Sequence, residues 1–196
     1  MFSRKEQIIQ RTGKNGVGRY DFLKLLVTEF QTSTSKDAKK QVLANLANFA
    51  YDPVNYDYLR QLHAIDLFLN VLSDSNESLV RFAIGGICNL SLDPINREYI
   101  LQNQGIALVS SLLDSRDEQT VLSAVTTLMF LVTSASKKNI ATQANIQKIL
   151  TFSDSPNRRI KNLALVFLAD YCTVEEVEQS RRIPPSNSVA DIPLPS

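Results

Sequence analysis

The chain has 196 residues, 44% of them hydrophobic and 21% charged, a balance that allows one folded domain with a sizeable core and excludes a collagen-like or disulfide-dense scaffold. Its 21 basic and 20 acidic residues nearly cancel, which argues against a molecule held on a polyanion by its overall field. The start has no apolar signal segment and no apolar run reaches about 18 residues, so we expect neither secretion nor a membrane span.

The segment 1–18 contains three of the six glycines among basic and polar residues, and we predict a flexible arm there. From residue 19 the pattern changes, because apolar side chains recur at helical spacing between Phe22 and Phe30. We predict that this segment is a helix that caps one end of a helical domain spanning residues 19–182.

Three similar units follow, each with a long apolar helix, a short helix and a further helix. The first long helix begins at Asp37 and stops at residues 52–53, an Asp-Pro pair. A second Asp-Pro pair, at 93–94, stops the second long helix. The third begins at Gln119, where Ser134–Ser136 replaces the Asp-Pro stop. We therefore predict about three full repeats.

Gly105 falls between two helices of the second unit, where we expect a positive φ. A partial fourth unit after Pro156 closes the domain. The end of the chain, 183–196, holds four of the seven prolines, which excludes a helix or a central strand. We predict an extended tail there.

The spacing of the two Asp-Pro pairs, 52–53 and 93–94, lies within the period of roughly 40 to 47 residues that armadillo and HEAT solenoids show. The pairs Asn48-Phe49 and Asn89-Leu90, each followed by a further asparagine at 55 or 96, resemble the armadillo repeat. Longer runs at 41–53, 82–86 and 120–124 resemble the small family of armadillo-repeat-containing protein seven. The predicted fold is all-α: a right-handed armadillo-type superhelical solenoid of about three full repeats plus terminal caps.

This resemblance implies a function that the periodicity alone does not give. It implies a nuclear, non-enzymatic subunit of the minor spliceosome that binds and stabilises an RNA-recognition-motif protein in pre-mRNA splicing. RNA would then be contacted mainly through that partner. A cytoplasmic location in addition to the nucleus stays open, and no membrane or small-molecule substrate is expected.

In armadillo arrays the long helices line a concave groove, and Asn48 and Asn89 resemble the clamps that hold the backbone of an extended peptide. A side-chain amide suits this role because it both donates and accepts hydrogen bonds. The alternative is that each asparagine bonds only to neighbouring turns. We predict that the groove is also lined by nearby small, polar and aromatic residues, namely Asn45, Phe82, Gly85, Gly86, Thr126, Thr127 and Phe130.

The third and fourth units limit a long peptide ladder. Phe130 and Ala169 take the asparagine position in the third and fourth units, so the groove becomes apolar toward its end. Phe82 is either part of an exposed binding patch or a packed contact between repeats. Basic clusters are mostly expected to be solvated, but Arg158 and Lys161, if they reach the groove, would meet an acidic partner segment or RNA phosphate.

No catalytic, metal or cofactor site is predicted. The single histidine, His63, has no recognisable catalytic partners, and Asp52 and Asp93 are turn residues. Cys88 and Cys172 are expected to be buried thiols in a reducing compartment. Two alternatives to a scaffold remain: direct RNA binding, with affinity that falls steeply with salt, and a peptide-binding cargo adaptor, which the absence of tryptophan disfavours.

Overall fold

The computed structural model describes residues 2–4, 6, 7, 10 and 16–182, and in this part of the chain it contains helices and turns but no β-strand. The α-helices are α2 (Arg19–Thr32), α3 (Lys36–Phe49), α4 (Tyr56–Gln61), α5 (Ala64–Val71), α6 (Glu77–Leu90), α7 (Pro94–Gln102), α8 (Gly105–Ser111), α9 (Glu118–Leu131), α10 (Lys137–Ile140), α11 (Gln143–Phe152), α12 (Arg158–Tyr171) and α13 (Val174–Arg182). Two short 3₁₀ helices, η1 (Pro53–Asn55) and η2 (Leu112–Asp114), also lie within residues 16–182. No described helix is long and apolar enough to cross a membrane.

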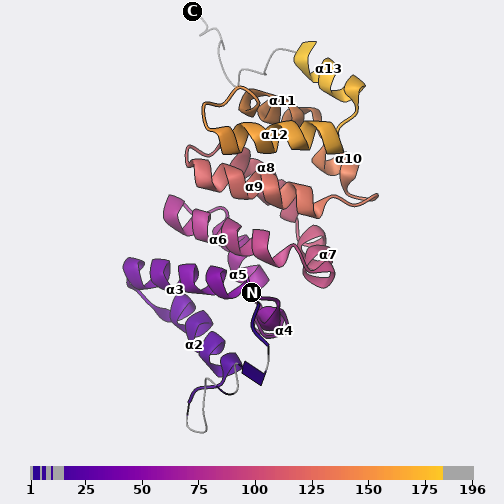
Figure 1. The fold of residues 1–196 in the computed structure, drawn as a ribbon. Coiled ribbons are helices and arrows are strands. Elements are labelled where there is room, and N and C mark those ends of the chain that lie inside the picture. Colours follow the sequence, from indigo (N-terminus) through magenta and orange to yellow (C-terminus); the bar gives the residue numbers. More distant parts are fainter. Residues whose placement is uncertain (1, 5, 8–9, 11–15, 183–196) are drawn as a thin grey trace, which may run out of the picture.

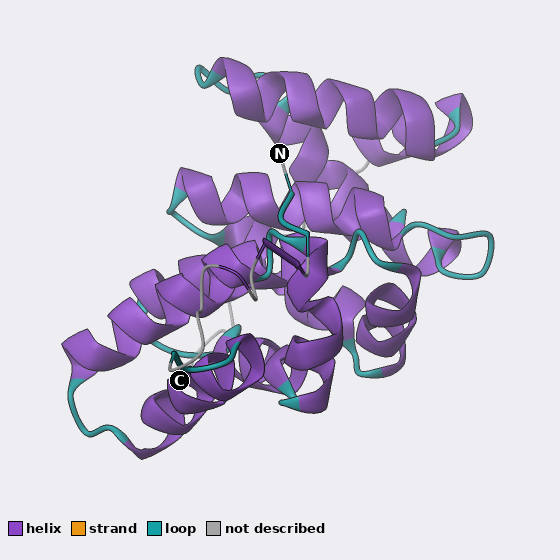
Figure 2. Cartoon of the chain, turned by 60° about the horizontal axis from the view of Figure 1, so that its bottom comes forward, coloured by secondary structure: helices purple, strands orange, loops and turns teal. Residues whose placement is uncertain are grey.

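The long helices of the four units are α3, α6, α9 and α12, and below the term long helix means these four. They lie side by side: α3 packs on α6, α6 on α9, and α9 on α12 (Figure 1). Behind them α5, α8 and α11 form a second layer, each packed against the long helix that follows it. The short helices α4, α7 and α10 lie along one edge of the stack. Figure 2 shows the same rows of helices from another direction. The predicted all-α solenoid is confirmed.

Each long helix begins at a side chain that caps it. Ser35, Asn76, Asp117 and Asn157 accept hydrogen bonds from backbone N–H groups of the first turn, which otherwise have no partner. The four long helices can therefore be aligned at these caps, which defines equivalent positions in the four units. This alignment puts Asp170, and not Ala169, at the fourth-unit equivalent of Asn48, which corrects the position expected from the sequence.

Replacing Asn76 with alanine is expected to lower the free energy of unfolding by about 1 kcal/mol, because two N–H groups of α6 then lose their acceptor. Asn76 Oδ1 lies 3.1 Å from Ser78 N and 3.3 Å from Leu79 N. Urea denaturation followed by circular dichroism measures the loss. The exposed neighbour Ser75 makes no such bond, so Ser75→Ala is the control, and equal losses in the two variants would argue against the cap.

The Asp-Pro pairs stop one helix and also start the next. Asp93 Oδ1 accepts from Ile95 N at 3.1 Å and from Asn96 N at 3.0 Å at the start of α7. Asp52 Oδ1 accepts from Val54 N at 3.3 Å at the start of η1. Each proline takes the first helical position, where its missing N–H costs nothing.

A residue with positive φ lies between α4 and α5, and another between α7 and α8, but neither is the residue that we expected. His63 (φ 53°) and its repeat equivalent Gln104 (φ 60°) carry the positive φ, so the prediction for Gly105 is wrong. Gly105 is needed instead because α8 begins very close to α7. A Cβ on Gly105 would lie 2.3 Å from Ile100 Cγ2 and 2.5 Å from the Ile100 carbonyl oxygen.

The core lies between the long helices and the second layer. Its largest fully buried side chains include Phe68 on α5, Leu128 on α9 and Phe167 on α12. The ring of Phe68 rests against Gly86 of α6, where a Cβ would come within 2.6 Å of it. Close packing at these points holds each long helix at a fixed position in the stack.

The described part of the predicted arm makes contacts that the sequence did not suggest. Ser3 N donates to Asp52 Oδ2 at 3.0 Å, and the rings of Phe2 and Tyr51 have centroids 5.6 Å apart. These residues lie against the end of α3 (Figure 1). The predicted tail, 183–196, lies outside the described residues.

Candidate partner-binding face

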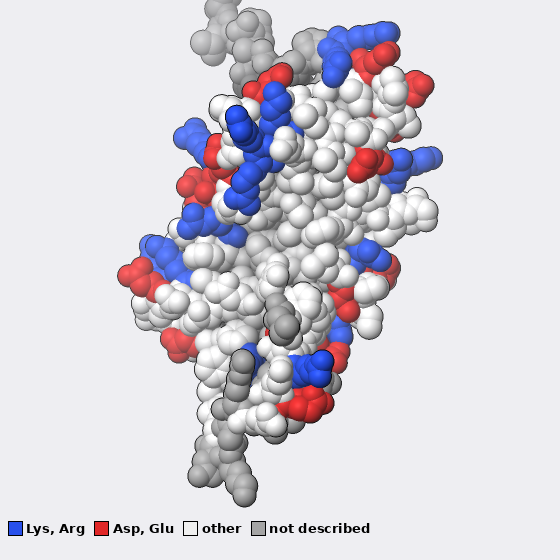
Figure 3. Space-filling view, in the orientation of Figure 1, with Lys and Arg blue, Asp and Glu red and all other residues white. Residues whose placement is uncertain are grey.

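The four long helices leave one side uncovered, and we call their exposed and half-buried side chains on this side the long-helix face. Positions repeat along it: Ala44, Gly85, Thr126 and Val166 are equivalent when the four helices are aligned at their caps. Figure 3 views the molecule from this side and shows charged side chains mainly toward the edges, with a mostly uncharged middle. Such a surface favours apolar and hydrogen-bonding contacts over ion pairing.

Asn48 and Asn89 both lie near the ends of their helices on this side, but they are engaged differently. Asn48 is exposed, and its amide makes no hydrogen bond within the described residues. Asn89 is half-buried, and its Nδ2 donates to the Ala47 carbonyl oxygen of α3 at 3.1 Å. The donor of Asn89 is therefore engaged by the preceding repeat, 42 residues away, and not by a neighbouring turn of its own helix. The amide of Asn48 makes neither kind of bond within the described residues.

A tyrosine adds a second hydrogen bond between the first and second repeats near Asn89. Tyr56 Oη, on α4, donates to the Asn89 carbonyl oxygen at 3.0 Å. Burial, and then the nearby charges of Asp93 and Asp52, raise the pKa of Tyr56 above its ordinary value. The phenol therefore stays protonated and remains a donor throughout the neutral range.

Phe82, Gly85 and Asn45 lie on the long-helix face, and all are half-buried. The Arg81 guanidinium carbon is 5.4 Å from the centre of the Phe82 ring, which it partly covers. A Cβ on Gly85 would have no atom within 4 Å, so the surface is open there. Asn45 Oδ1 accepts a long hydrogen bond, 3.4 Å, from Gln41 Nε2.

Gly86 and Thr127 do not lie on this face, in contrast to the prediction. Both are buried. Gly86 faces the Phe68 ring behind α6, and Thr127 Oγ1 donates to the Ser123 carbonyl oxygen at 2.7 Å within α9. One residue turns a helix by about 100°, so Gly85 and Thr126 face the open side while their neighbours face the core.

A hollow of about 400 Å³ lies on the long-helix face between α9 and α12. It includes Thr126 of the predicted set, whereas Phe130 is half-buried one turn further along α9. Its lining combines amide, hydroxyl, thiol and apolar groups: Cys88, Gln119, Leu122, Ser123, Thr126, Arg159, Asn162, Leu163 and Val166. This chemistry suits an extended chain with apolar side chains and an unpaired backbone.

Several of these lining residues were missed from the sequence. Gln119, Ser123 and Thr126 are the equivalents of Ser78, Phe82 and Gly85, and the same alignment carries the pattern to Arg159, Leu163 and Val166. Projecting the predicted residues Phe82 and Gly85 onto the later units would have found Ser123, Leu163 and Val166. Asn162 is the equivalent of Leu122, which also lines the hollow.

Some basic residues of α12 line the hollow and others do not. Arg159 contributes to the hollow, whereas Arg158 and Lys161 are exposed on α12 and do not line it. The single step along the helix between Arg158 and Arg159 again decides which side chain faces the open side.

The cysteines are free thiols, and both are half-buried. Burial raises the pKa of Cys88, although a hydrogen bond with Thr127 opposes the shift. Burial also raises the pKa of Cys172 to about 11. Both groups are therefore protonated at neutral pH, which is the inert form of a cysteine.

Comparison with known proteins gives a near relative and a consistent fold. No family model matches the chain. Armadillo repeat-containing protein 7 of Mus musculus is 60% identical over 181 residues, which cover 91% of each chain. A designed armadillo repeat protein in complex with the peptide (KR)4 has a TM-score of 0.71 at 16% identity, covering 83% of this chain and 72% of that one. A computationally designed armadillo repeat protein for modular peptide recognition gives 0.71 at 17% identity, with the same coverage.

Proposed function

The chain belongs to the armadillo repeat-containing protein 7 family, and from this premise we propose that it is a non-enzymatic scaffold whose long-helix face holds an extended segment of a partner protein. The partner proposed is an RNA-recognition-motif protein of the minor spliceosome, which the chain binds and stabilises in the nucleus during pre-mRNA splicing. RNA is then contacted mainly by that partner.

One observation carries the choice of this face. The amide of Asn48 is exposed and has no hydrogen-bond partner within the described residues, beside a surface that is open at Gly85. An extended segment presents unpaired backbone donors and acceptors, and a side-chain amide can satisfy one of each. The hollow between α9 and α12 then provides room for side chains further along the same path.

Three further observations agree with this proposal. The middle of the face is mostly uncharged, which disfavours direct binding of an RNA backbone there. One structure with the same fold holds the peptide (KR)4, so this architecture is able to present a peptide-binding surface. Small side chains along the strip, such as Ala44 and Gly85, let a bound backbone come close to the helices.

Asn48→Ala is expected to weaken capture of the partner about tenfold, because two backbone groups of the bound segment then lose their clamp. The measurement is titration of the purified RNA-recognition-motif protein by anisotropy or calorimetry. Asn70→Ala is the matched control, since Asn70 is an exposed asparagine on α5, away from this face. An Asn48→Ala variant that is folded and binds as well as the wild type removes the proposed site.

A further inference from the structure

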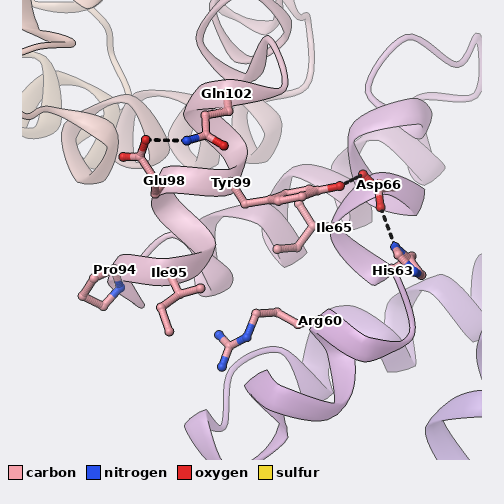
Figure 4. Close-up of a pocket in the computed structure, with 9 residues that line it drawn as sticks. All are labelled: Arg60, His63, Ile65, Asp66, Pro94, Ile95, Glu98, Tyr99 and Gln102. Atoms are coloured by element: carbon pink, nitrogen blue, oxygen red, sulfur yellow. Dashed lines mark hydrogen bonds and ion pairs between the residues drawn. The ribbon is translucent and has the colours of Figure 1, made fainter.

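A second recess lies away from the long-helix face, between the corner that joins α4 to α5 and the exposed side of α7 (Figure 4). We call it the α4–α7 cleft; its volume is about 550 Å³. Ile65, Ile95 and the ring of Tyr99 form its apolar wall. Ile95 is 63% exposed and Tyr99 is 37% exposed, so large apolar surface is left uncovered there.

The walls of the cleft are held rigidly by side-chain bonds across the repeat boundary. Arg60 Nη1 donates to Asp93 Oδ1 at 2.9 Å and to Asn96 Oδ1 at 2.8 Å, which joins α4 to the start of α7. Tyr99 Oη donates to Asp66 Oδ1 at 2.7 Å and so fixes the ring against α5. A recess whose walls are fixed before binding loses little entropy when it is filled.

The same surface one repeat earlier is covered by the chain itself. Tyr58 on α4 is the equivalent of Tyr99, and the ring of Tyr20 from α2 packs on it edge to face, with centroids 6.1 Å apart. Tyr20 follows a cation, Arg19, whose guanidinium lies 4.8 Å from the centre of the Phe49 ring. The fold thus shows that an aromatic side chain from another helix covers this kind of surface, while the neighbouring cation lies on the Phe49 ring. This covering stops at α4.

The charges around the cleft favour the same kind of occupant. Arg60 is already paired with Asp57 and Asp93. Glu98 lies on the rim with only a hydrogen bond from Gln102, and it has no ion pair among the described residues. Carboxylates therefore outnumber the arginine. A ligand that fills the cleft with an aromatic side chain and carries a cation beside it meets Glu98, a carboxylate without an ion pair among the described residues.

We propose that the α4–α7 cleft is a second docking site, distinct from the long-helix face, for a segment of another protein that inserts an aromatic side chain between Ile95 and Tyr99 and places a flanking Lys or Arg against Glu98. In this complex the inserted aromatic ring packs on Tyr99 in the way that the Tyr20 ring packs on Tyr58 one repeat earlier. The site lets the scaffold hold two segments at once, on different sides of the stack.

The probe is a labelled hexapeptide with a central tyrosine–leucine pair and two arginines on each side, titrated by fluorescence anisotropy. Ile95→Arg, which places bulk and positive charge in the cleft, is expected to weaken its binding about tenfold. Leu25→Arg on α2 is the matched control, because Leu25 is an equally exposed apolar residue, at 60%. A peptide with the tyrosine changed to alanine, and another with glutamines for arginines, are both expected to bind less tightly.

Three outcomes overturn the proposal. The first is equal peptide binding by Ile95→Arg and the wild type. The second is binding that Asn48→Ala abolishes, which would place the peptide on the long-helix face. The third is a wild-type dimer in light scattering that Ile95→Arg converts to a monomer, which would make a second copy the occupant. Failure here leaves the proposed function intact, since that function is read from partner binding by Asn48→Ala.

Discussion

Replacing Phe68 with alanine is expected to lower the free energy of unfolding by about 3–5 kcal/mol. The Phe68 side chain is fully buried on α5, and its ring fills the space against Gly86 of α6. Neither helix can close the gap easily, because α5 also packs on α4, and α6 packs on both α3 and α9. The loss therefore includes a cavity as well as lost burial. Urea denaturation with the midpoint and slope fitted together measures it.

Phe22→Ala is the matched control for this variant. Phe22 is 41% exposed on α2 and packs edge to face on Phe49, with ring centroids 5.7 Å apart. Its removal is expected to cost about 1 kcal/mol. Similar losses in the two variants would mean that the layer between α5 and α6 is not the main packed contact.

Local signals of the sequence were enough to predict the architecture. Capping residues recur before each long helix, and the two Asp-Pro pairs end one helix and begin the next. These interactions involve residues two or three positions apart, so they can be read without knowing the fold. The same holds for the apolar stripe of each helix, whose buried residues Leu43, Ile84 and Val125 are repeat equivalents.

The side of each helix that faces the core was predicted less well than the residues at which the helix begins and ends. Periodicity groups residues on a helix into a stripe, but it does not say which edge of the stripe meets the next helix. Gly85 and Gly86 look alike in the sequence, yet one is open and the other lies under the Phe68 ring. The difference depends on α5, which packs on α6.

The contacts between distant segments were not predictable from the pattern. Arg60 reaches Asp93 and Asn96 on the next unit, and Asn89 reaches Ala47 on the previous one. Each pair joins residues of different repeats, so the α4–α7 cleft and the engaged amide of Asn89 appear only when the units are stacked. Asn48, at the same position one unit earlier, was left exposed by that stacking.

Gly86→Val is expected to destabilise the protein by about 3 kcal/mol, although valine is a better helix former than glycine. A Cβ at this position would lie 2.6 Å from Phe68 Cζ and 2.8 Å from both Cε atoms, and the fully buried ring has no free space to move into. Gly85→Val adds the same atoms at the preceding residue of α6, where no atom lies within 4 Å of the new Cβ. That variant is expected to change the stability by less than about 0.5 kcal/mol.

The pair also separates packing from partner binding. If Gly86 lined the long-helix face, valine there would weaken partner capture and leave unfolding unchanged. Because Gly86 is buried, the reverse is expected: Gly86→Val lowers the urea midpoint, while Gly85→Val keeps the midpoint and weakens capture by blocking the open surface. Both quantities are measured on the same two purified variants. A stable Gly86→Val protein with impaired capture would return Gly86 to the binding surface.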